Sequence, residues 1–518
     1  MKKHTLRNIF FVVASSVMLA VAWPPSDLNF ILFFAFVPVL MAVFEQKKTR
    51  KAFLYFYLSF QLFLILIHSP LLIEGDYFIP LSIGLVFIPI IWSMPVVIAH
   101  KIAKSRGLSA SLFLFPFIYL SQEVVQYYWD FGMTYFNMGV GLSNTPFFLG
   151  IYPFLGQEGG TLLILGFNCG LVFLFQKIKN EKVEIYHALP LGLFVLIIAI
   201  TYLTAPDAQK KGTLQVAIFQ PDKQKIDRIK NNLSAKIDLL ETEIEKNKGR
   251  KIDLIICPES FFVDMEKKPL IVNNLETHEA IQRLMFLSSE YGVPIFSGAI
   301  LVEMFRADEP PTPSAKPRRN EPGVYFDIYN GSLFVTPDKQ IAWRTKQSLV
   351  PFSESIPFYK AFNYLERKGL WPTRYDKTYG VVPFEGPFRY KNINIAPVIC
   401  FESVFPVVVD SYIQNEANLI VVLSTNWTTS QRVLNQQQDA MSIVQKSFGK
   451  TVLYATLDQQ SSVTDFNGQR KFSSSPFEVK EVRLHDSSSM YALVASKPWC
   501  WIVLSLILVL LVVSKKNI

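Results

Sequence analysis

Charged residues are scarce in this chain. Asp, Glu, Lys and Arg together make up 18% of its 518 residues, whereas soluble proteins average about 25%. Half of the residues are hydrophobic, aromatic residues reach 14%, and the mean hydropathy is +0.26. This composition excludes an ordinary soluble protein. It predicts a long membrane-embedded region, with enough chain left for at least one globular domain.

Cysteine is also scarce, with four in the whole chain. So few cysteines provide no disulfide framework, and neither a Cys-x-x-Cys pair nor a cysteine–histidine spacing typical of zinc is present. A phosphate-binding loop is missing as well, so we expect neither a metal nor a cofactor. Cys169 and Cys500 lie in or beside apolar runs, which leaves Cys257 and Cys400 in the polar part. A lone cysteine in a suitable context is a candidate nucleophile.

The net charge of +9 does not indicate a nucleic-acid partner. The excess lysines and arginines stand in short loops beside apolar runs, where such residues fix the orientation of a membrane protein. We therefore expect no nucleic acid among the partners.

Seven apolar runs fill the first 205 residues, and an eighth closes the chain. Each has about the length needed to cross a hydrocarbon core of about 30 Å as a helix. We expect eight transmembrane helices, near residues 8–23, 29–46, 52–73, 79–100, 110–128, 159–176, 188–205 and 498–514.

Positive charge divides the loops into two sets. The loops around 24–28, 74–78 and 129–158 contain no lysine or arginine. The N-terminus, the other loops and the tail carry fifteen: Lys2, Lys3, Arg7, Lys47, Lys48, Arg50, Lys51, Lys101, Lys104, Arg106, Lys177, Lys179, Lys182, Lys515 and Lys516. The positive-inside rule then predicts that both termini are cytoplasmic and that residues 206–497 lie outside. The first run also resembles a signal peptide, but Trp23-Pro24-Pro25 is a poor mature start, so we expect a retained helix.

The loop at 129–158 is rich in aromatic residues. An aromatic belt at the membrane interface is the simpler interpretation. A lipid-facing flap beside an active site is the alternative.

From about residue 212 short β-branched runs alternate with polar stretches of helical period, which is typical of a layered α/β domain. We therefore expect a seven-helix region at 1–205, an extracytoplasmic domain at 206–497, and a last helix with a cytoplasmic tail at 498–518. The proline-rich residues 309–322 read as a surface insertion. The expected strands are 213–219, 252–257, 293–302, 393–399, 419–423 and 451–456, and the expected helices are 223–248, 275–291, 404–414 and 431–448.

A carboxylate follows the second expected strand, in Pro258-Glu259-Ser260. Folds of the α/β class place their chemistry at the C-terminal ends of buried strands. Partial burial there would raise the pKa of Glu259 and make it a useful base. A helix cap or a loop salt bridge remains the alternative for Glu259 taken alone.

A lysine precedes an apolar turn at 343–354, which reads Trp-Arg-Thr-Lys-Gln-Ser-Leu-Val-Pro-Phe-Ser-Glu. Any single lysine is usually a solvated surface residue. The apolar turn directly after Lys346, ending in Glu354, argues against that interpretation here.

Cys400 follows the expected strand 393–399, within Ile-Cys-Phe-Glu-Ser. A tight turn there, with a helix beginning directly after it, would stabilise a thiolate and offer N–H groups to an oxyanion. A buried structural cysteine is the alternative, and it is our interpretation of Cys257.

The order Pro-Glu, then Lys before Leu-Val-Pro-Phe-x-Glu, then Ile-Cys-Phe-Glu resembles the Glu–Lys–Cys set of the nitrilase superfamily. With the flanking apolar runs, the whole chain resembles the membrane branch of that superfamily, the apolipoprotein N-acyltransferases. The resemblance implies an αββα sandwich on the periplasmic side of a bacterial inner membrane, attached to about eight transmembrane helices.

The resemblance also implies a reaction. Members of the family transfer an acyl chain from a phospholipid to the α-amine of a lipoprotein's diacylglyceryl-cysteine. Glu259 would be the general base, Cys400 the nucleophile that forms a thioester, and Lys346 the group that stabilises the oxyanion. Glu354 and Glu402 match additional acidic positions of the family and would support Lys346 and Cys400.

The chain departs from the family after strand 419–423. It reads Ser424-Thr425-Asn426-Trp427 where Asn-Asp-x-Trp is typical, and Gln437 stands where histidine is usual. Other departures are Ser442, Val444 and the segment 456–460. Three alternatives therefore stay open: a membrane-anchored amidase or lipid hydrolase, an acyltransferase with a different amine acceptor, and a scaffold or transporter without catalysis.

Overall fold

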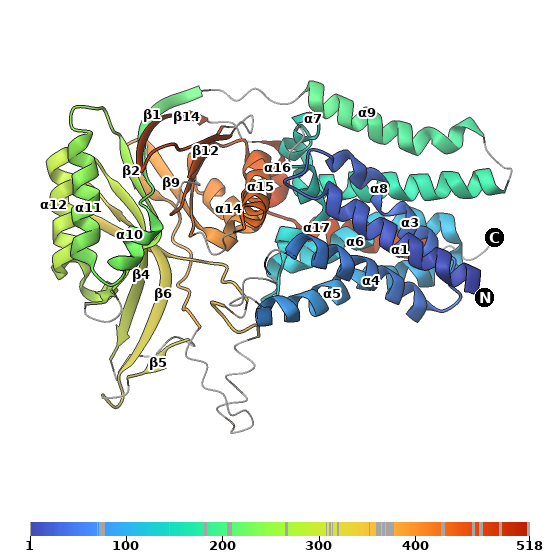
Figure 1. Ribbon diagram of the computed structural model, residues 1–518, viewed down its shortest axis with the longest axis horizontal. Coiled ribbons are helices and arrows are strands. Elements are labelled where there is room, and N and C mark those ends of the chain that lie inside the picture. The colour runs from blue at the N-terminus through green and yellow to red at the C-terminus, as the bar shows by residue number, and fades with distance from the viewer. Residues whose placement is uncertain are drawn as a thin grey trace. The chain divides into compact units, whose positions relative to one another are not determined.

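In the computed structural model the chain forms two compact units (Figure 1). Unit 1 comprises Met1–Asp207, Thr428–Phe448 and Ser489–Ile518, and unit 2 comprises Ala208–Trp427 and Gly449–Ser488. Residues 428–448 lie inside the expected α/β domain along the chain but belong to unit 1. The structure describes residues 2–69, 71, 78–143, 146–180, 184–204, 210–264, 268–306, 308–309, 312, 314–318, 321–351, 353–358, 364, 368, 378–425, 430–457, 461–465, 470–485 and 489–514.

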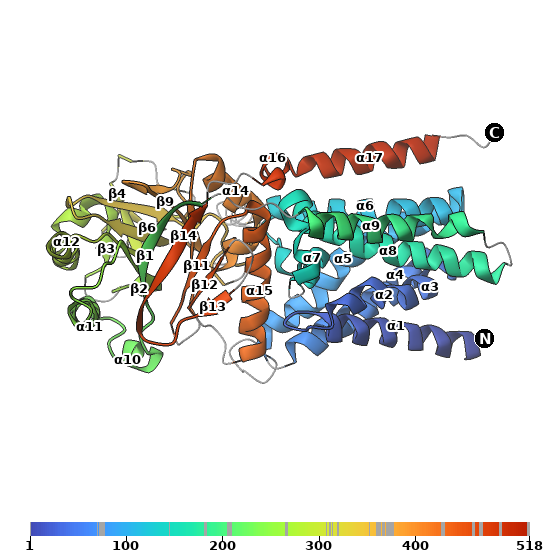
Figure 2. The same cartoon turned by 90° about the horizontal axis from the view of Figure 1, so that it is seen from above.

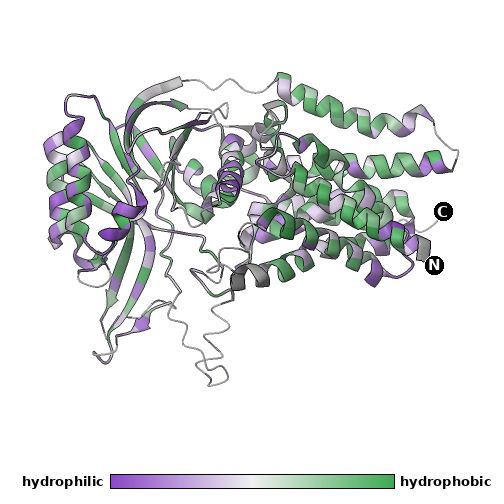
Figure 3. Cartoon of the chain, in the orientation of Figure 1, coloured by the Kyte–Doolittle hydropathy of each residue, from purple (hydrophilic) through white to green (hydrophobic). Residues whose placement is uncertain are grey.

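Unit 1 is a helical bundle, and hydrophobic residues cover most of its helices (Figures 2 and 3). Six of the helices described are long and apolar enough to cross a membrane, and Asn29–Phe44 and Trp499–Ser514 are shorter apolar segments. The chain is a multi-pass membrane protein. The helices are α1 (Lys2–Ala22), α2 (Leu32–Ala35), α3 (Val37–Phe44), α4 (Thr49–His68), α5 (Phe78–Arg106), α6 (Leu108–Val125), α7 (Pro146–Leu149), α8 (Tyr152–Lys179), α9 (Leu189–Leu203), α15 (Gln431–Phe448), α16 (Met490–Ala495) and α17 (Trp499–Ser514).

The second apolar run is broken rather than a single helix. Pro38 stands in the first turn of α3, where its missing N–H costs nothing. The buried amide of Asn168 in α8 then satisfies the backbone at the break: its oxygen accepts the N–H groups of Phe36 and Val37, at 2.9 and 3.1 Å. Its nitrogen donates to the carbonyl of Leu32 at 2.8 Å. A polar group inside an apolar bundle thus replaces the hydrogen bonds that a continuous helix would make.

The aromatic loop after α6 packs into unit 1 over much of its length. Phe136 is 7% exposed, and its ring lies edge-on to those of Trp92 and His68, with centroids 5.4 and 5.2 Å apart. Met138 and Val140 are buried as well. These three side chains therefore fill the bundle instead of facing outward. Trp129, Phe131 and Tyr135 are half-buried and Phe147 is 43% exposed, so an interfacial belt at these residues stays a prediction.

Unit 2 is a layered α/β sandwich, as Figure 1 shows. One sheet has the order β14-β1-β2-β4-β6-β5, with β3 beside β4 and β7 beside β6, and the other has the order β13-β12-β11-β10-β9-β8. The strands of the first sheet are β1 (Lys210–Phe219), β2 (Leu254–Phe262), β3 (Leu270–Ile271), β4 (Ile295–Phe305), β5 (Lys316–Pro317), β6 (Tyr325–Val335), β7 (Ile341–Thr345) and β14 (Phe477–His485). Those of the second sheet are β8 (Phe388–Tyr390), β9 (Ile393–Ile399), β10 (Leu419–Leu423), β11 (Val452–Ala455), β12 (Ser462–Thr464) and β13 (Arg470–Phe472).

The two sheets face each other across a shared apolar core. Side chains such as Val216 and Ile256 of the first sheet pack with Ile395 and Val421 of the second. Helices α11 (Leu233–Lys246) and α12 (Glu279–Tyr291) cover the outer face of the first sheet, and α14 (Pro406–Gln414) packs against β9. The predicted combination of a helical membrane region with an αββα-type domain is confirmed.

Two expected elements differ in detail. The expected helix 223–248 is two helices, α10 (Lys223–Arg228) and α11, because the Asn232 side chain accepts the N–H of Ala235 and begins α11. The expected insertion at 309–322 is attached to the first sheet where the structure describes it. Its Thr312 and Ser314 hydroxyls donate to the buried carboxylate of Asp327, and β5 pairs with β6. Residues 310, 311, 313, 319 and 320 lie outside the described residues.

Gly298 in β4 provides a test of how closely the strands approach. A Cβ added there would lie 2.5 Å from the Cα of Glu259 and 2.7 Å from the N of Ser260, so the backbone of β2 would have to move. We expect Gly298→Ala to lower the free energy of unfolding by about 1–3 kcal/mol, as other overpacked sites do. Thermal unfolding of the detergent-solubilised protein measures the change.

Gly212→Ala is the matched control, because nothing lies within 4 Å of a Cβ at that position. A Gly298→Ala protein as stable as the Gly212→Ala protein would show that β2 and β4 do not require this close approach.

Candidate active site

Glu259 lies inside β2, three residues before its end, rather than after a strand at 252–257. The register between β2 and β4 shifts between Cys257 and Phe262, and Ser260 has φ +50°, so the strand bulges at the carboxylate. The residue is 5% exposed. Its Oε1 accepts Asn330 Nδ2 at 2.9 Å, and its Oε2 accepts the Thr425 hydroxyl at 3.3 Å.

Lys346 follows β7 directly and is completely buried. Gly331 pairs with Thr345, so the preceding and following residues, Asn330 and Lys346, are neighbours as well. The N–H of Lys346 donates to the carbonyl of Asn330 at 2.8 Å. The ammonium lies 2.8 Å from Glu354 Oε1 and 3.9 Å from Glu259 Oε1. The lysine is therefore held between two carboxylates and is not a surface residue.

Glu354 is positioned by the apolar turn that precedes it. The backbone N–H of Glu354 donates to the carbonyl of Val350 at 2.9 Å, and the Oε2 of Glu354 accepts the N–H of Val350 at 2.8 Å. Its Oε1 accepts Asn330 Nδ2 at 2.9 Å in addition to the ammonium. The turn thus returns the chain to Lys346 eight residues later. Phe352 within it lies outside the described residues.

Cys400 is the first residue after β9 and has φ +48°. A positive φ is uncommon for any residue other than glycine, and backbone strain of this kind is frequent at functional sites. Leu423 of β10 pairs with Ile399, so Ser424 stands beside Cys400, and its hydroxyl donates to Sγ at 3.6 Å. The nucleophile candidate therefore sits where two parallel strands end.

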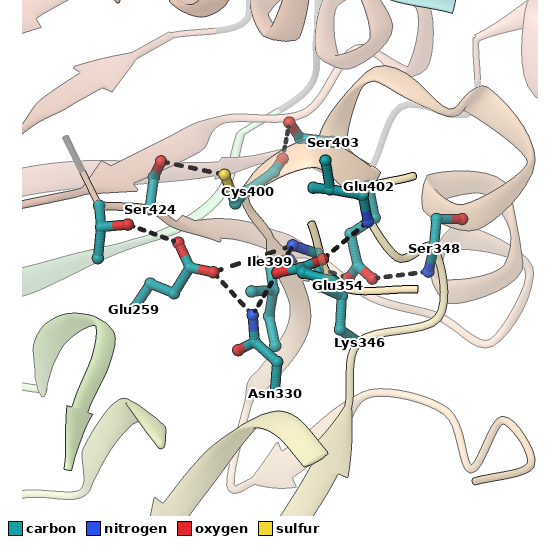
Figure 4. A network of polar contacts seen from close by, with 12 residues as sticks. Glu259, Asn330, Lys346, Ser348, Glu354, Ile399, Cys400, Glu402, Ser403 and Ser424 are labelled. Atoms are coloured by element: carbon teal, nitrogen blue, oxygen red, sulfur yellow. Dashed lines mark hydrogen bonds and ion pairs between the residues drawn. The ribbon is translucent and has the colours of Figure 1, made fainter. Parts of the chain in front are cut away.

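Glu402 holds the turn after Cys400 (Figure 4). The carboxylate is fully buried and accepts the N–H groups of Ile399 at 2.9 Å and Gln347 at 2.7 Å. One side chain thereby joins the residue before Cys400 to the residue after Lys346. Burial outweighs the two N–H groups, which lower the pKa of Glu402, and the net result is a pKa raised to about 7.

Burial and negative charge dominate the electrostatics. Burial raises the pKa of Glu259; the Lys346 ammonium lowers it again, and Glu354 raises it. Burial lowers the pKa of Lys346, but the carboxylates of Glu354 and Glu259 raise it by more, so the lysine stays charged. Glu259 is thus closer to the pKa that a general base needs at neutral pH.

The Cys400 thiol is protonated at neutral pH. Burial and then the Glu259 charge raise its pKa to about 12, while Lys346 and the Ser424 hydroxyl lower it in part. The expectation that a helix N-terminus directly after Cys400 would hold a thiolate is wrong. Residues Cys400–Val404 form a 3-10 turn, and α14 begins only at Pro406.

The structure brings together the five residues that the sequence singled out, namely Glu259, Lys346, Glu354, Cys400 and Glu402. Figure 4 shows them converging from both sheets. The structure also adds Asn330, which donates to the carboxylates of Glu259 and Glu354, and the hydroxyls of Ser424 and Thr425. Asn330 carried no local signal, whereas the other two stand among the departures noted after strand 419–423. Cys257 is buried within β2.

This geometry can move a proton from a thiol to a carboxylate beside a fixed positive charge. It defines a cysteine-dependent transferase or hydrolase on a sandwich of two sheets. Residues 215–474 match the carbon-nitrogen hydrolase family, and residues 15–170 match the apolipoprotein N-acyltransferase N-terminal domain. The chain belongs to the carbon-nitrogen hydrolase family, within the nitrilase superfamily. It is a membrane-embedded acyltransferase enzyme.

Two relatives that share one name cover most of this chain. An apolipoprotein N-acyltransferase of Chlorobaculum tepidum is 22% identical over 81% of this chain and 79% of its own length. The apolipoprotein N-acyltransferase of Thermotoga maritima is 22% identical over 81% of this chain and 76% of its own length. Among solved structures, an amidase from Nesterenkonia sp. has a TM-score of 0.35 and 14% identity, and it covers 56% of this chain and 96% of its own.

Lys346 allows a test of the buried charges. We expect Lys346→Met to lower the free energy of unfolding by about 3–5 kcal/mol at neutral pH, because Glu259 and Glu354 lose their counter-charge. Without the ammonium, which lowers the pKa of Glu259, that pKa rises further, so the penalty is largest at high pH and shrinks as the pH falls and Glu259 protonates. Thermal unfolding between pH 5 and pH 8 measures it.

The control is Lys251→Met, which removes an ammonium whose side chain is 76% exposed. A Lys346→Met penalty that does not change with pH would contradict the assignment of its cause to uncompensated carboxylates.

Glu402 allows a test of the bridge between the two sheets. In Glu402→Gln one of the two acceptors becomes an NH₂ group, which faces a backbone N–H. We expect a loss of about 1–3 kcal/mol in stability and slower alkylation of Cys400. Glu416→Gln, at an exposed ion pair with Arg389, should change neither quantity. Unchanged stability in Glu402→Gln would exclude a supporting role for the carboxylate.

Proposed function

We propose that the protein transfers an acyl chain from a membrane phospholipid to the N-terminal diacylglyceryl-cysteine amine of lipoproteins, through a thioester on Cys400. The observation that carries the proposal is the cluster of the buried Glu259 and Lys346 with the half-buried Cys400, on the same chain as a multi-pass helical bundle. The names of the relatives, apolipoprotein N-acyltransferase, agree with acyl transfer to an amine of a lipoprotein.

The first half-reaction begins with the protonated thiol. Glu259 takes the proton from Cys400 as the sulfur attacks the ester carbonyl, so a free thiolate of high pKa never accumulates. Negative charge develops on the carbonyl oxygen, and the ammonium of Lys346 stabilises it. The C–O bond then breaks, the leaving alkoxide takes the proton from Glu259, and lysophospholipid departs.

The second half-reaction uses the same groups in reverse. The neutral amine of the acceptor attacks the thioester, and Glu259 takes a proton from its nitrogen. The C–S bond breaks, and Cys400 regains a proton. Because a thioester is activated toward amines, the transfer needs no nucleotide, and the two substrates react in turn in a ping-pong sequence.

The membrane unit supports a periplasmic site in a bacterial inner membrane with both termini cytoplasmic. Arg7 near the start of α1 pairs with Glu45 after α3, and Arg106 at the end of α5 donates to Val513 near the end of α17. Helix ends that carry basic residues therefore share one end of the bundle. By the positive-inside rule this end is cytoplasmic. The long segment between α9 and α17 then begins and ends on the other side.

The test uses purified protein in detergent with a phospholipid labelled in its sn-1 chain. We expect an acyl adduct by intact mass that hydroxylamine removes and that is absent in Cys400→Ser. Cys500→Ser is the control, because that cysteine is exposed in α17 and lies outside the site. Addition of a diacylated lipopeptide should discharge the adduct as N-acyl lipopeptide.

The other outcomes separate the alternatives. Discharge of the adduct only as free fatty acid would identify a lipid hydrolase, and discharge to another amine would identify a different acceptor. No adduct with any phospholipid would overturn the donor assignment. The sequence departures at Asn426, Trp427 and 458–460 lie outside the described residues.

A further inference from the structure

The end of β10 places one hydroxyl group beside the proposed nucleophile, Cys400, and another beside the proposed base, Glu259. Ser424 donates to Cys400 Sγ at 3.6 Å, and the next residue, Thr425, donates to Glu259 Oε2 at 3.3 Å. The parallel pairing of β9 with β10 brings them there, since Leu423 and Ile399 are in register.

The two oxygens of Glu259 differ in their partners. Oε1 accepts Asn330 Nδ2 at 2.9 Å and lies 3.9 Å from the ammonium of Lys346. An amide NH₂ and an ammonium can only donate. A proton on Oε1 would therefore point at other protons, and that oxygen is unsuited to receive the thiol proton.

Oε2 has a different partner. Among the residues that the structure describes, its hydrogen-bond partner is the hydroxyl of Thr425. A hydroxyl donates one proton and also accepts, and it rotates to suit its neighbour. It can donate to the carboxylate before the transfer and accept from the carboxylic acid after it. Figure 4 shows one Glu259 oxygen toward Asn330 and Lys346 and the other on the side of Ser424.

We propose that Thr425 is a positioning residue for the proton transfer in this site. Oε2 of Glu259 takes the thiol proton, and during this transfer the Thr425 hydroxyl changes from hydrogen-bond donor to hydrogen-bond acceptor toward Oε2. The S–H bond breaks, its electron pair stays on sulfur, and the new O–H bond forms on Oε2. The inference rests on the proposed roles of Glu259 and Cys400, but it requires neither the phospholipid nor the lipoprotein.

Among the residues that the structure describes, the titratable and polar groups around Glu259 bear on the prediction. The groups come from several elements: Asn330 of β6, Lys346 after β7, Glu354 of the apolar turn, Tyr379, Cys400 after β9, Thr425 after β10 and Tyr454 of β11. Of these, Asn330 and Thr425 make hydrogen bonds that favour the charged carboxylate, as does the nearby ammonium. Loss of the Thr425 hydroxyl therefore raises the pKa of Glu259.

The experiment follows the alkylation rate of Cys400 by iodoacetamide against pH, in full-length protein carrying Cys500→Ser. Cys169 and Cys257 are buried, so Cys400 dominates the signal. Thr425→Val keeps the shape and removes the hydroxyl. We expect its acid limb to move up by about one pH unit, the size of one hydrogen bond to a charged group. Thr425→Ala should show the same shift, and Thr425→Ser should restore the original profile.

Thr451→Val is the matched control. Its hydroxyl is also hydrogen-bonded, to the carbonyl of Arg483 at 2.7 Å, but it lies at the opposite end of the same strands, before β11. Its profile should equal that of the parent. An unshifted profile in Thr425→Val and Thr425→Ala would overturn the proposal, and so would a Thr425→Ser profile like that of Thr425→Val. Because alkylation needs no acyl donor, failure of phospholipid transfer leaves this test intact.

Discussion

The burial of one ammonium group governs the arrangement of this site. Lys346 is fully buried, and a charge so placed persists only beside opposite charge. Glu354 and Glu259 supply it, at 2.8 and 3.9 Å. Burial in the same site raises the pKa of Glu259, against the lowering effect of the lysine. Burial and then the Glu259 charge keep the nearby thiol protonated. The constraint that holds the lysine therefore also gives the thiol a base beside it.

That arrangement needs both sheets. Glu259 and Lys346 come from the first sheet and Cys400 from the second, so the distance between thiol and base depends on how the sheets are held at this end. The buried Glu402 joins Ile399 to Gln347, and Thr425 joins β10 to Glu259. These polar contacts lie next to backbone with positive φ, which costs free energy at each such residue. The precision of the site is thus maintained by hydrogen bonds across the sheets against local strain.

The sequence predicts strands far better than it predicts which polar residues meet. The expected strands 393–399 and 419–423 agree with β9 and β10, because short β-branched runs bounded by polar residues have one common interpretation. The bulge at Glu259 could not be predicted, since it depends on Gly298 of the neighbouring strand. Asn330 was missed because only the register of β6 with β7 places it between two carboxylates. In the sequence, Thr425 was only a departure from the pattern of the family that the chain resembles. The structure shows that its hydroxyl donates a hydrogen bond to Glu259.

The asymmetry of Glu259 also constrains how the two substrates reach the site. In the proposed reaction this carboxylate takes a proton once from the thiol and once from the acceptor amine. The donors on Oε1 belong to the first sheet and do not change between the two steps. If Oε2 serves both steps, the leaving group and the amine must approach from the side of β10 in turn. A single proton-accepting oxygen therefore favours one binding region that the two substrates occupy in turn over two separate binding regions. Such successive occupation is what a ping-pong reaction requires.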